Sequence, residues 1–405
     1  MFFCTNYPNR KAQAIHAMIN LNVKYAIKEP GSAFETTGYS KKSFVFMFTR
    51  ILFTGFMTLA TLFAVAQTAA EKAAANEREA LKYMDSGNYE KAADYYKDAL
   101  KLSPDDMKYQ YGLALAYYRA ENYPKAIEFA EKTLQNNPDL DCYRLLGNSY
   151  DLNNEYEKGM AILQKGFERF PANGALYLDM GVIELIRNRP QQAIEHWEAG
   201  IKADPSFADN YFLAAQTYAG SDRKVWALLY GEAFMNLERG TARWDTMSHL
   251  LYHLCTGLLA DSTYLQKGTL QLPRTKTNGF EQAHLRVFDI LRKNGMMSPD
   301  RAKKADGTTN TLKLIGMVRK NFLEMWLQTF TLLYSNNLYA NLRQMMDRGY
   351  LEAYNNWMFS PVCTHDFLEW KAGNEAKYTD FINWFLENPL KVDVESYFVR
   401  QQYEK

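Results

Sequence analysis

The chain has 405 residues, of which 47% are apolar and 15% aromatic, and this composition excludes an intrinsically disordered protein. Its 47 lysines and arginines are balanced by 46 aspartates and glutamates, so no excess of positive charge indicates a nucleic-acid partner. The four cysteines show neither a CxxC pair nor a regular spacing, which argues against a disulfide framework or a structural zinc site.

An export signal is expected near the amino terminus. Residues 51–66, ILFTGFMTLATLFAVA, form an apolar run that ends in a small-x-small pattern, which signal peptidase accepts. The run is shorter than the roughly 20 apolar residues of a membrane span, so cleavage after Ala66 is favoured over a retained anchor. Residues 1–66 are therefore interpreted as leader and signal peptide, and translation from Met47 would give a signal of normal length. The mature chain from Gln67 is expected to be exported, without a membrane span, to the periplasm of a cell with two membranes.

Residues 67–240 contain a pattern with a period of about 34 residues. Prolines, tyrosines and small residues recur in register, namely Pro104, Pro138, Pro171 and Pro205; Tyr83, Tyr117 and Tyr150; and Ala92, Ala126, Gly159 and Ala193. Each segment reads as two amphipathic helices, A and B, followed by a proline that cannot continue the helix. The segments begin near Ala73, Met107, Leu140, Gly174 and Ala208. The pattern predicts an all-α solenoid of about five helix-turn-helix repeats.

These spaced positions resemble tetratricopeptide repeats (TPR) over residues 73–240. The resemblance implies a docking surface for peptides or proteins and does not specify a particular partner. The segment Leu228–Gly240, LLYGEAFMNLERG, together with a signal ending in AVAQ, also resembles uncharacterised exported TPR proteins of Bacteroidota.

The resemblance further implies a concave groove lined by helix A side chains. The expected protein-binding residues are Leu81, Met84, Tyr111, Leu115, Tyr118, Arg144, Asn148, Leu178, Val182, Leu185, Phe212 and Gln216. This groove is mainly apolar, and only Arg144 and Asn148 resemble the residues with which some members clamp a carboxylate, so no such clamp is expected. An exposed apolar strip of this length needs a cover. A segment of a partner protein and the chain's own C-terminal region are equally acceptable covers.

Residues 241–405 are predicted to form a helical region rich in aromatic residues. We expect helices over Thr241–Ser262, Glu281–Lys293, Thr311–Tyr334, Leu338–Trp357, His365–Ala372 and Tyr378–Glu387, with polar loops at 268–280 and 297–310. Many aromatic residues are three or four positions apart and so share a helical face, which favours a packed core. The alternative is an aromatic platform for a sugar or another ligand, in which Trp357 and Trp370 would take part.

No catalytic, cofactor or metal site is predicted. His249 and His253 share a helical face, but no third metal ligand is evident, because Cys255 points away from His253. Asp179 and Glu184 are interpreted as solvated helix positions.

Cys363, His365 and Asp366 are residue types of a nucleophilic triad, yet adjacency in sequence does not create triad geometry. The favoured function is therefore an exported, non-enzymatic scaffold that docks another protein in its groove. The alternative is a ligand- or carbohydrate-binding protein that uses the C-terminal aromatic residues. No pattern indicates an oligomeric state.

Overall fold

The computed structural model describes residues 68–272 and 279–404. The chain divides into two compact units, Met1–Lys72 and Ala73–Lys405, and the second contains the repeats and the C-terminal region. The predicted signal peptide and its cleavage after Ala66 lie outside the described residues. Within the described ranges, no helix combines the length and the apolar character that crossing a membrane requires.

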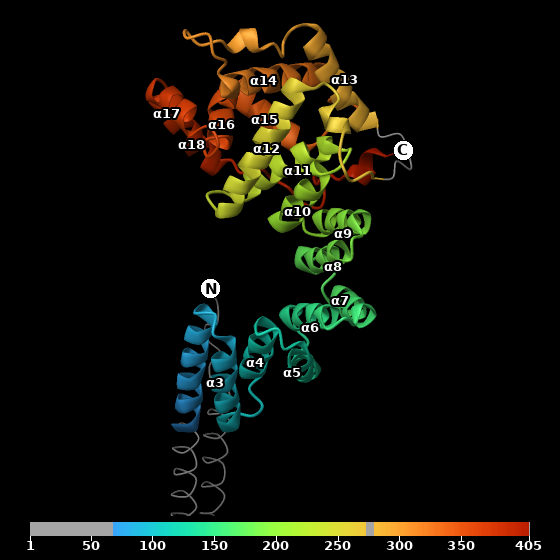
Figure 1. Cartoon of the computed structure of the whole chain (residues 1–405), viewed down its shortest axis with the longest axis vertical. Coiled ribbons are helices and arrows are strands. Elements are labelled where there is room, and N and C mark those ends of the chain that lie inside the picture. Colours follow the sequence, from blue (N-terminus) through green and yellow to red (C-terminus); the bar gives the residue numbers. More distant parts are fainter. Residues whose placement is uncertain (1–67, 273–278, 405) are drawn as a thin grey trace, which may run out of the picture. The chain divides into compact units, whose positions relative to one another are not determined.

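The described residues of the second unit are helical throughout the predicted repeat array (Figure 1). Residues 73–85 supply helix A of the first repeat. The helices that follow are α3 (Tyr89–Leu102), α4 (Met107–Arg119), α5 (Tyr123–Asn136), α6 (Leu140–Leu152), α7 (Tyr156–Arg169), α8 (Gly174–Ile186), α9 (Pro190–Ala203), α10 (Ala208–Ala219) and α11 (Lys224–Leu237). Helices α4, α6, α8 and α10 begin at the predicted residues, and the predicted all-α solenoid is confirmed.

The turn inside each of the first four repeats contains one residue with a left-handed backbone. These residues are Gly87, Glu121, Asn154 and Asn188, with φ of 77°, 58°, 63° and 58°. The fifth repeat departs from this geometry, because Gly220 has φ of −77° and Ser221 pairs with Leu270 in an isolated β-bridge. The sequence period therefore also governs the backbone of the turns, except at the last repeat.

Replacing Glu121 with glycine is expected to raise the free energy of unfolding by about 0.5–1 kcal/mol. A left-handed backbone costs a non-glycine residue about 1–2 kcal/mol, and the greater freedom of glycine in the unfolded chain offsets part of the gain. Urea denaturation would measure the change. The matched control is Gly87→Ala, where the added Cβ would meet no atom within 4 Å, so that only the backbone is tested. Loss of stability in Glu121→Gly would contradict this account of the turn.

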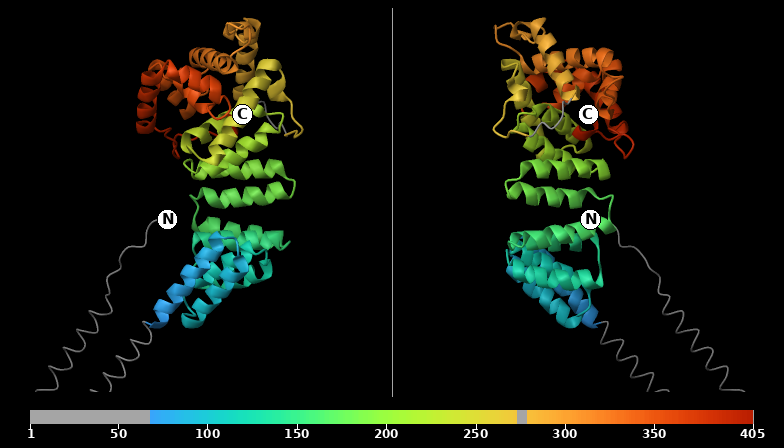
Figure 2. Two further views of the ribbon diagram at one scale, coloured as in Figure 1. Left: turned by 60° about the vertical axis from the view of Figure 1, so that its left-hand side comes forward. Right: turned by 90° about the vertical axis from the view of Figure 1, so that its right-hand side faces the viewer.

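Small residues allow the two helices of a repeat to approach closely. A Cβ added to Gly181 on α8 would lie 2.2 Å from Nε1 of Trp197 on α9, and one added to Gly147 would lie 2.6 Å from Cγ of Leu163. Trp197 and Leu163 are the bulky residues that follow small residues by four positions in helix B, and both are fully buried. The helix pairs consequently lie side by side, as both views in Figure 2 show.

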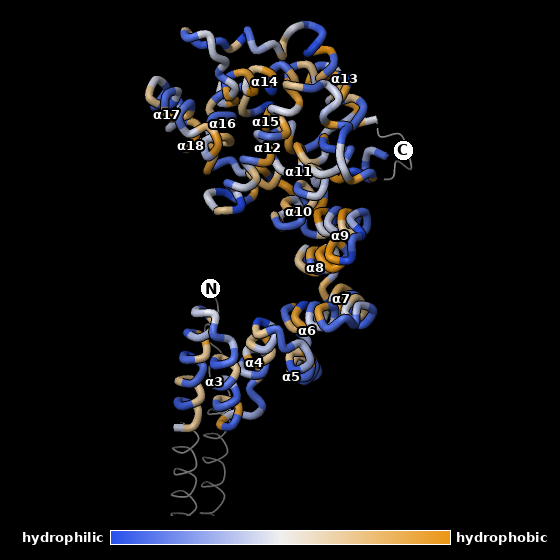
Figure 3. Tube along the Cα trace, in the orientation of Figure 1, coloured by the Kyte–Doolittle hydropathy of each residue, from blue (hydrophilic) through white to orange (hydrophobic). Residues whose placement is uncertain are grey.

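The core of the array consists of small clusters between neighbouring repeats. One cluster joins the first two repeats around Leu113, the next contains Leu146, and a third surrounds Leu176. Such a core of successive local interfaces is typical of solenoids. Figure 3 shows that α8 is hydrophobic along most of its length, and its residues contribute to two clusters.

The C-terminal region is also helical. Its helices are α12 (Ala242–Ala260), α13 (Gly279–Lys293), α14 (Thr311–Thr329), α15 (Asn337–Asp347), α16 (Leu351–Met358), α17 (Thr364–Ala372) and α18 (Glu375–Glu387), with short 3-10 turns η1 (Tyr264–Gln266), η2 (Pro299–Ala302) and η3 (Arg400–Tyr403). Several boundaries differ from the prediction, and α18 begins at Glu375 where Tyr378 was expected. Helix α14 ends at Thr329, and the single helix expected over Leu338–Trp357 is broken at Gly349, whose φ of 75° ends α15.

The aromatic residues of the C-terminal region form its core. Trp326 is fully buried, and its ring lies 4.1 Å from the ring of His284 and 5.4 Å from that of Phe280. This cluster extends into the last two repeats through Trp197 and Trp226. The fourth and fifth repeats and the C-terminal helices therefore share one continuous core.

Candidate docking surface

All the predicted groove residues lie on helix A of their repeats, and among the described residues none of them is buried. Leu81 is 47% exposed and Leu185 is 40% exposed, while most of the others are half-buried. Their assignment as a protein-binding groove stays a prediction.

The first two repeats contribute an apolar part of this surface. The side chains of Met84 and Tyr118 are partly buried and pack against the hydrophobic cluster of the first two repeats. Tyr111 and Leu115 pack in the same way against the next cluster. Burial raises the pKa of the Tyr118 hydroxyl above its usual value. A second apolar part, Leu178, Val182 and Leu185, follows on α8.

A polar bridge separates the two apolar parts. Arg144 on α6 donates from Nε to Oδ2 of Asp179 at 2.5 Å and from Nη2 to Oδ1 at 3.1 Å. Asn148 lies beside Asp179 and favours its charged form. The pKa of Asp179 is raised by burial, although Arg144 and Asn148 oppose the shift. Since the charge of Arg144 is already compensated, the geometry argues against a carboxylate clamp at this position.

Asp179 and Glu184 are buried, so their interpretation as solvated positions is wrong. Asp179 is 7% exposed and Glu184 is 4% exposed. Glu184 accepts a hydrogen bond from the Tyr156 hydroxyl at 2.5 Å and pairs with Arg189 at 3.4 Å. Both acids meet a partner on the neighbouring repeat, because burying an unpaired carboxylate would be costly.

A second ion pair supports the same interface. Arg187, just after α8, donates from Nη2 to Oδ1 of Asp151 on α6 at 2.7 Å. Its guanidinium carbon also lies 4.2 Å from the centre of the Tyr156 ring. The third and fourth repeats are thus joined by charged and aromatic contacts in addition to the apolar cluster around Leu176.

The fifth repeat is in contact with the start of the C-terminal region. The guanidinium of Arg243 on α12 lies 5.4 Å from the ring of Phe212 and pairs with Asp209 at 2.5 Å. Phe212 also packs on Phe234 of α11 at 4.9 Å, whereas Gln216 is exposed. The chain's own C-terminal region therefore partly covers Phe212.

The last residues of the chain also pack on the array. Arg400 in η3 pairs with Glu198 on α9 at 3.1 Å and donates to the hydroxyl of Tyr218 on α10 at 2.7 Å. Glu404 pairs with Arg223 at 2.8 Å. These contacts anchor the C-terminal segment to the fourth and fifth repeats and were not anticipated from the sequence.

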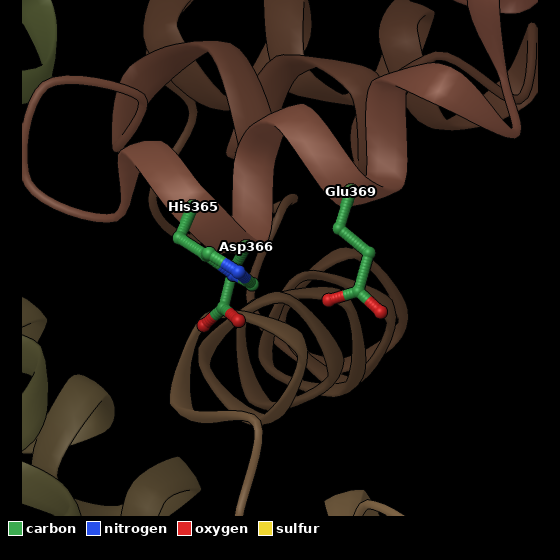
Figure 4. Close-up of side chains that lie close together, drawn as sticks. All are labelled: His365, Asp366 and Glu369. Atoms are coloured by element: carbon green, nitrogen blue, oxygen red, sulfur yellow. The ribbon is translucent and has the colours of Figure 1, made fainter.

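The histidines singled out in the sequence are exposed. His249 and His253 project into solvent on α12, while Cys255 is buried. A different group, His365, Asp366 and Glu369 on α17, has potential metal-binding atoms within 4.8 Å of one another (Figure 4).

Asp366 is already engaged within this group. Its Oδ1 accepts a hydrogen bond from Nζ of Lys304 at 2.7 Å, so a metal ion would have to displace a lysine. Burial raises the pKa of the neighbouring Cys363 thiol, which disfavours the reactive thiolate. The side chains of Cys363, His365 and Asp366 therefore lack the pairing that a nucleophilic triad requires.

The two tryptophans of the alternative ligand site have different surroundings. Trp357 is half-buried against the core, with its ring 5.0 Å from that of Trp244 and 4.8 Å from that of Phe385. Trp370 is half-buried and lines a surface pocket between α14, α16, α17 and α18. An aromatic platform that contains both residues is thus not formed.

Comparison with known proteins agrees with the fold. Residues 77–141 match the tetratricopeptide repeat family. No curated protein matches the chain.

Part of the chain is also similar to solved structures. The pilF structure of Pseudomonas aeruginosa is 19% identical, with a TM-score of 0.38, and the match covers 49% of this chain and 89% of that one. TTC0263, a TPR protein of Thermus thermophilus, is 16% identical, with a TM-score of 0.37 and coverage of 44% and 98%. YrrB, a TPR protein with an unusual peptide-binding site, is 21% identical, with a TM-score of 0.29 and coverage of 40% and 84%. Residues 77–141 thus match the tetratricopeptide repeat family, and they lie within a helical solenoid that leads into a helical C-terminal region.

Proposed function

We propose that this protein is an exported, non-enzymatic scaffold that docks an apolar segment of another protein on the helix A surface of repeats one to four. A TPR fold is typical of protein-interaction scaffolds. The observation that carries the proposal is the exposure of apolar helix A side chains from Leu81 to Leu185, while the C-terminal segment packs on repeats four and five. Exposed apolar surface on both sides of the polar bridge favours an interaction site.

The chemistry of the surface favours an uncharged, apolar segment. Tyr111, Leu115, Leu178 and Val182 offer half-buried apolar side chains on either side of the polar bridge. Arg144 is neutralised by Asp179, so the bridge presents no free cation to an acidic peptide. A partner segment with apolar anchors that flank a neutral polar residue would match this order.

Export is part of the proposal and depends on the signal sequence. The mature protein would then begin at Gln67, and its partner would be an exported protein. The mass of the protein recovered from the exported fraction tests this, because a chain of residues 67–405 is expected. A recovered chain that retains residues 51–66 would contradict it.

Charged substitutions on the surface are expected to weaken the docking at least roughly tenfold, which corresponds to about 1.4 kcal/mol. We would cross-link the protein in the exported fraction, identify the partner and measure its affinity for purified protein by calorimetry. Leu81→Glu and Leu185→Glu place a charge at exposed helix A positions, so folding should tolerate both. Each would force a carboxylate against an apolar segment.

The matched control is Leu102→Glu. Leu102 is 38% exposed, close to Leu185, but it lies at the end of α3, which is a helix B. It should leave the affinity unchanged. Equal affinities for the original protein, Leu81→Glu and Leu185→Glu would overturn the proposed surface, and so would equal losses in all three variants.

A further inference from the structure

A polar pocket lies in the C-terminal region, away from the helix A residues of the docking surface. Its volume is about 480 Å³, and its walls come from α14, α16, α17 and α18. Figure 1 shows α17 and α18 beside α16. A pocket of this volume can hold a small molecule of several rings or hydroxyl groups.

The pocket floor holds one oriented amide. Asn355 on α16 is 2% exposed, and its Oδ1 accepts a hydrogen bond from Nε of Arg319 at 2.6 Å. Because a guanidinium can only donate, the oxygen of this amide must face Arg319. Arg319 is itself held by Glu232. The Nδ2 donor of Asn355 is therefore turned away from Arg319, and it has no hydrogen-bond partner among the described residues.

Gly316 on α14 keeps the space in front of this donor open. A Cβ at Gly316 would meet only the Asn355 side chain, with 3.7 Å to Nδ2. A larger side chain would project into the pocket. The backbone of α14 thus approaches a side-chain donor that borders the pocket and is available to a ligand.

The pocket walls carry an excess of positive charge. Of the two acids in the lining, Glu352 pairs with Lys377 at 2.6 Å and Asp366 pairs with Lys304 at 2.7 Å. Lys313 makes no ion pair within the described part of the chain, and Lys320 has only an exposed contact with Glu324 at 3.7 Å. Both lysines line the pocket from α14, two turns apart on one face. An anionic group of a ligand would meet two exposed lysines here.

Trp370 supplies an aromatic wall. Its indole Nε1 donates to Oε1 of Glu352 at 3.1 Å, which fixes the orientation of the ring. Such a ring packs well against the apolar face of a sugar. The lining thus combines an aromatic wall, an amide donor and two exposed lysines.

We propose that this pocket binds a small anionic carbohydrate, a sugar ring that carries a carboxylate or a phosphate. The anionic group meets Lys313 and Lys320, a hydroxyl accepts the hydrogen bond of Asn355 Nδ2, and the ring packs on Trp370. This site is independent of the docking surface, because it shares no residue with the helix A positions of repeats one to four.

Calorimetry on the full chain tests the site with three probes: D-glucuronate, D-glucose 6-phosphate and neutral D-glucose. We expect saturable binding of at least one anionic probe at millimolar concentration, roughly tenfold or more tighter than that of glucose. The comparison of the two anions shows whether a carboxylate or a phosphate is preferred. Absence of saturable binding by both anions would overturn the proposal, as would equal binding of glucose.

Two variants locate the binding. Gly316→Leu fills the pocket and, since leucine is a better helix former than glycine, should preserve α14. Lys313→Gln removes one exposed charge without a packing change. Both should lower the affinity for the anionic probe at least roughly tenfold. Lys293→Gln on α13, which removes an exposed lysine outside the pocket, should not. Binding that Gly316→Leu or Lys313→Gln retains in full would place the probe elsewhere and refute the assignment.

Discussion

Replacing Glu198 with alanine is expected to lower the free energy of unfolding by about 3–5 kcal/mol, the usual cost of removing one partner of a buried ion pair. Glu198 is fully buried on α9 and accepts hydrogen bonds from the hydroxyls of Tyr218 and Tyr230 at 2.8 and 3.0 Å. It also pairs with Arg400 at 3.1 Å. Without the carboxylate, Arg400 and both hydroxyls would lose a buried acceptor.

The large effect follows from the position of Glu198 between distant parts of the chain. Burial raises the pKa of Glu198, and the opposing influence of Arg400 and the two tyrosines keeps the carboxylate paired. Arg400 also forms an ion pair with Glu404, and Glu404 forms a further ion pair with Arg223. The C-terminal segment is therefore attached to the array by charges that alternate in sign.

Urea denaturation followed by circular dichroism measures this effect. The control is Glu128→Ala, which removes an exposed ion pair with Lys132 and should cost less than about 1 kcal/mol. The variant Arg400→Met should lose stability similarly to Glu198→Ala, and the double variant should lose less than the sum of the two. Additive losses would show that the two residues do not interact in the folded protein.

Acidification from pH 7 to pH 4.5 should cost about 2–3 kcal/mol of stability through His284 alone. Burial lowers the pKa of His284 to about 3 from its usual 6.5, although the contact of Nδ1 with the carbonyl oxygen of Phe280 opposes the shift. Below pH 6.5 the unfolded chain takes up a proton on this residue while the folded chain does not. The stability therefore falls as the pH decreases, by up to about 1.4 kcal/mol per unit, until the pH approaches the folded pKa.

The surroundings of His284 explain why it stays neutral. Its Nε2 meets the hydroxyl of Tyr339, and a cavity of about 70 Å³ beside it is also lined by Glu232 and Arg319, which pair with each other. A neutral imidazole that carries its proton on Nδ1 can donate a hydrogen bond to the Phe280 carbonyl and accept one from the Tyr339 hydroxyl. A protonated ring would have to donate from Nε2 as well, in a site that offers little solvent.

Denaturation of the original protein and of His284→Gln at several pH values isolates this contribution. The variant should lose the extra pH dependence between pH 6.5 and 4.5, whatever its stability at pH 7. His249→Gln, at an exposed site on α12, should retain the dependence of the original protein. Parallel curves for the original protein and His284→Gln would contradict burial of a neutral His284.

The repeat array was predictable because its signals are local. A proline two residues beyond the end of helix B, as at Pro104, and a turn residue such as Gly87 fix helix boundaries without distant partners. The sequence period then repeats these boundaries. The helix break at Gly349 was missed because apolar periodicity continues across it, although the glycine was a usable signal.

The polar interior was not predictable from local pattern alone. Asp179 and Glu184 look like solvated helix positions until Arg144 and Tyr156 of the preceding repeat are placed beside them. Opposite charges about one repeat apart were an available signal that residue-by-residue interpretation overlooked. Glu198 and Arg400 offered no such signal, because their pairing joins the array to the last residues of the chain.

The residues of the docking surface could be predicted from the sequence, whereas the pocket could not. The groove residues follow from the repeat register, and the structure leaves them accessible on helix A. The pocket depends on how α14, α16, α17 and α18 meet, which the periodicity of each helix does not determine. Trp370 could be named from the sequence, but not its separation from Trp357, which packs against the core.

Hydrogen exchange of the full chain with and without the identified partner segment tests the docking proposal most directly. The account predicts slower exchange in α4, α6 and α8, where the helix A surface would be covered, and unchanged exchange in α14, α16, α17 and α18. Protection confined to these C-terminal helices, or no change in α4, α6 and α8 at saturating partner, would contradict it.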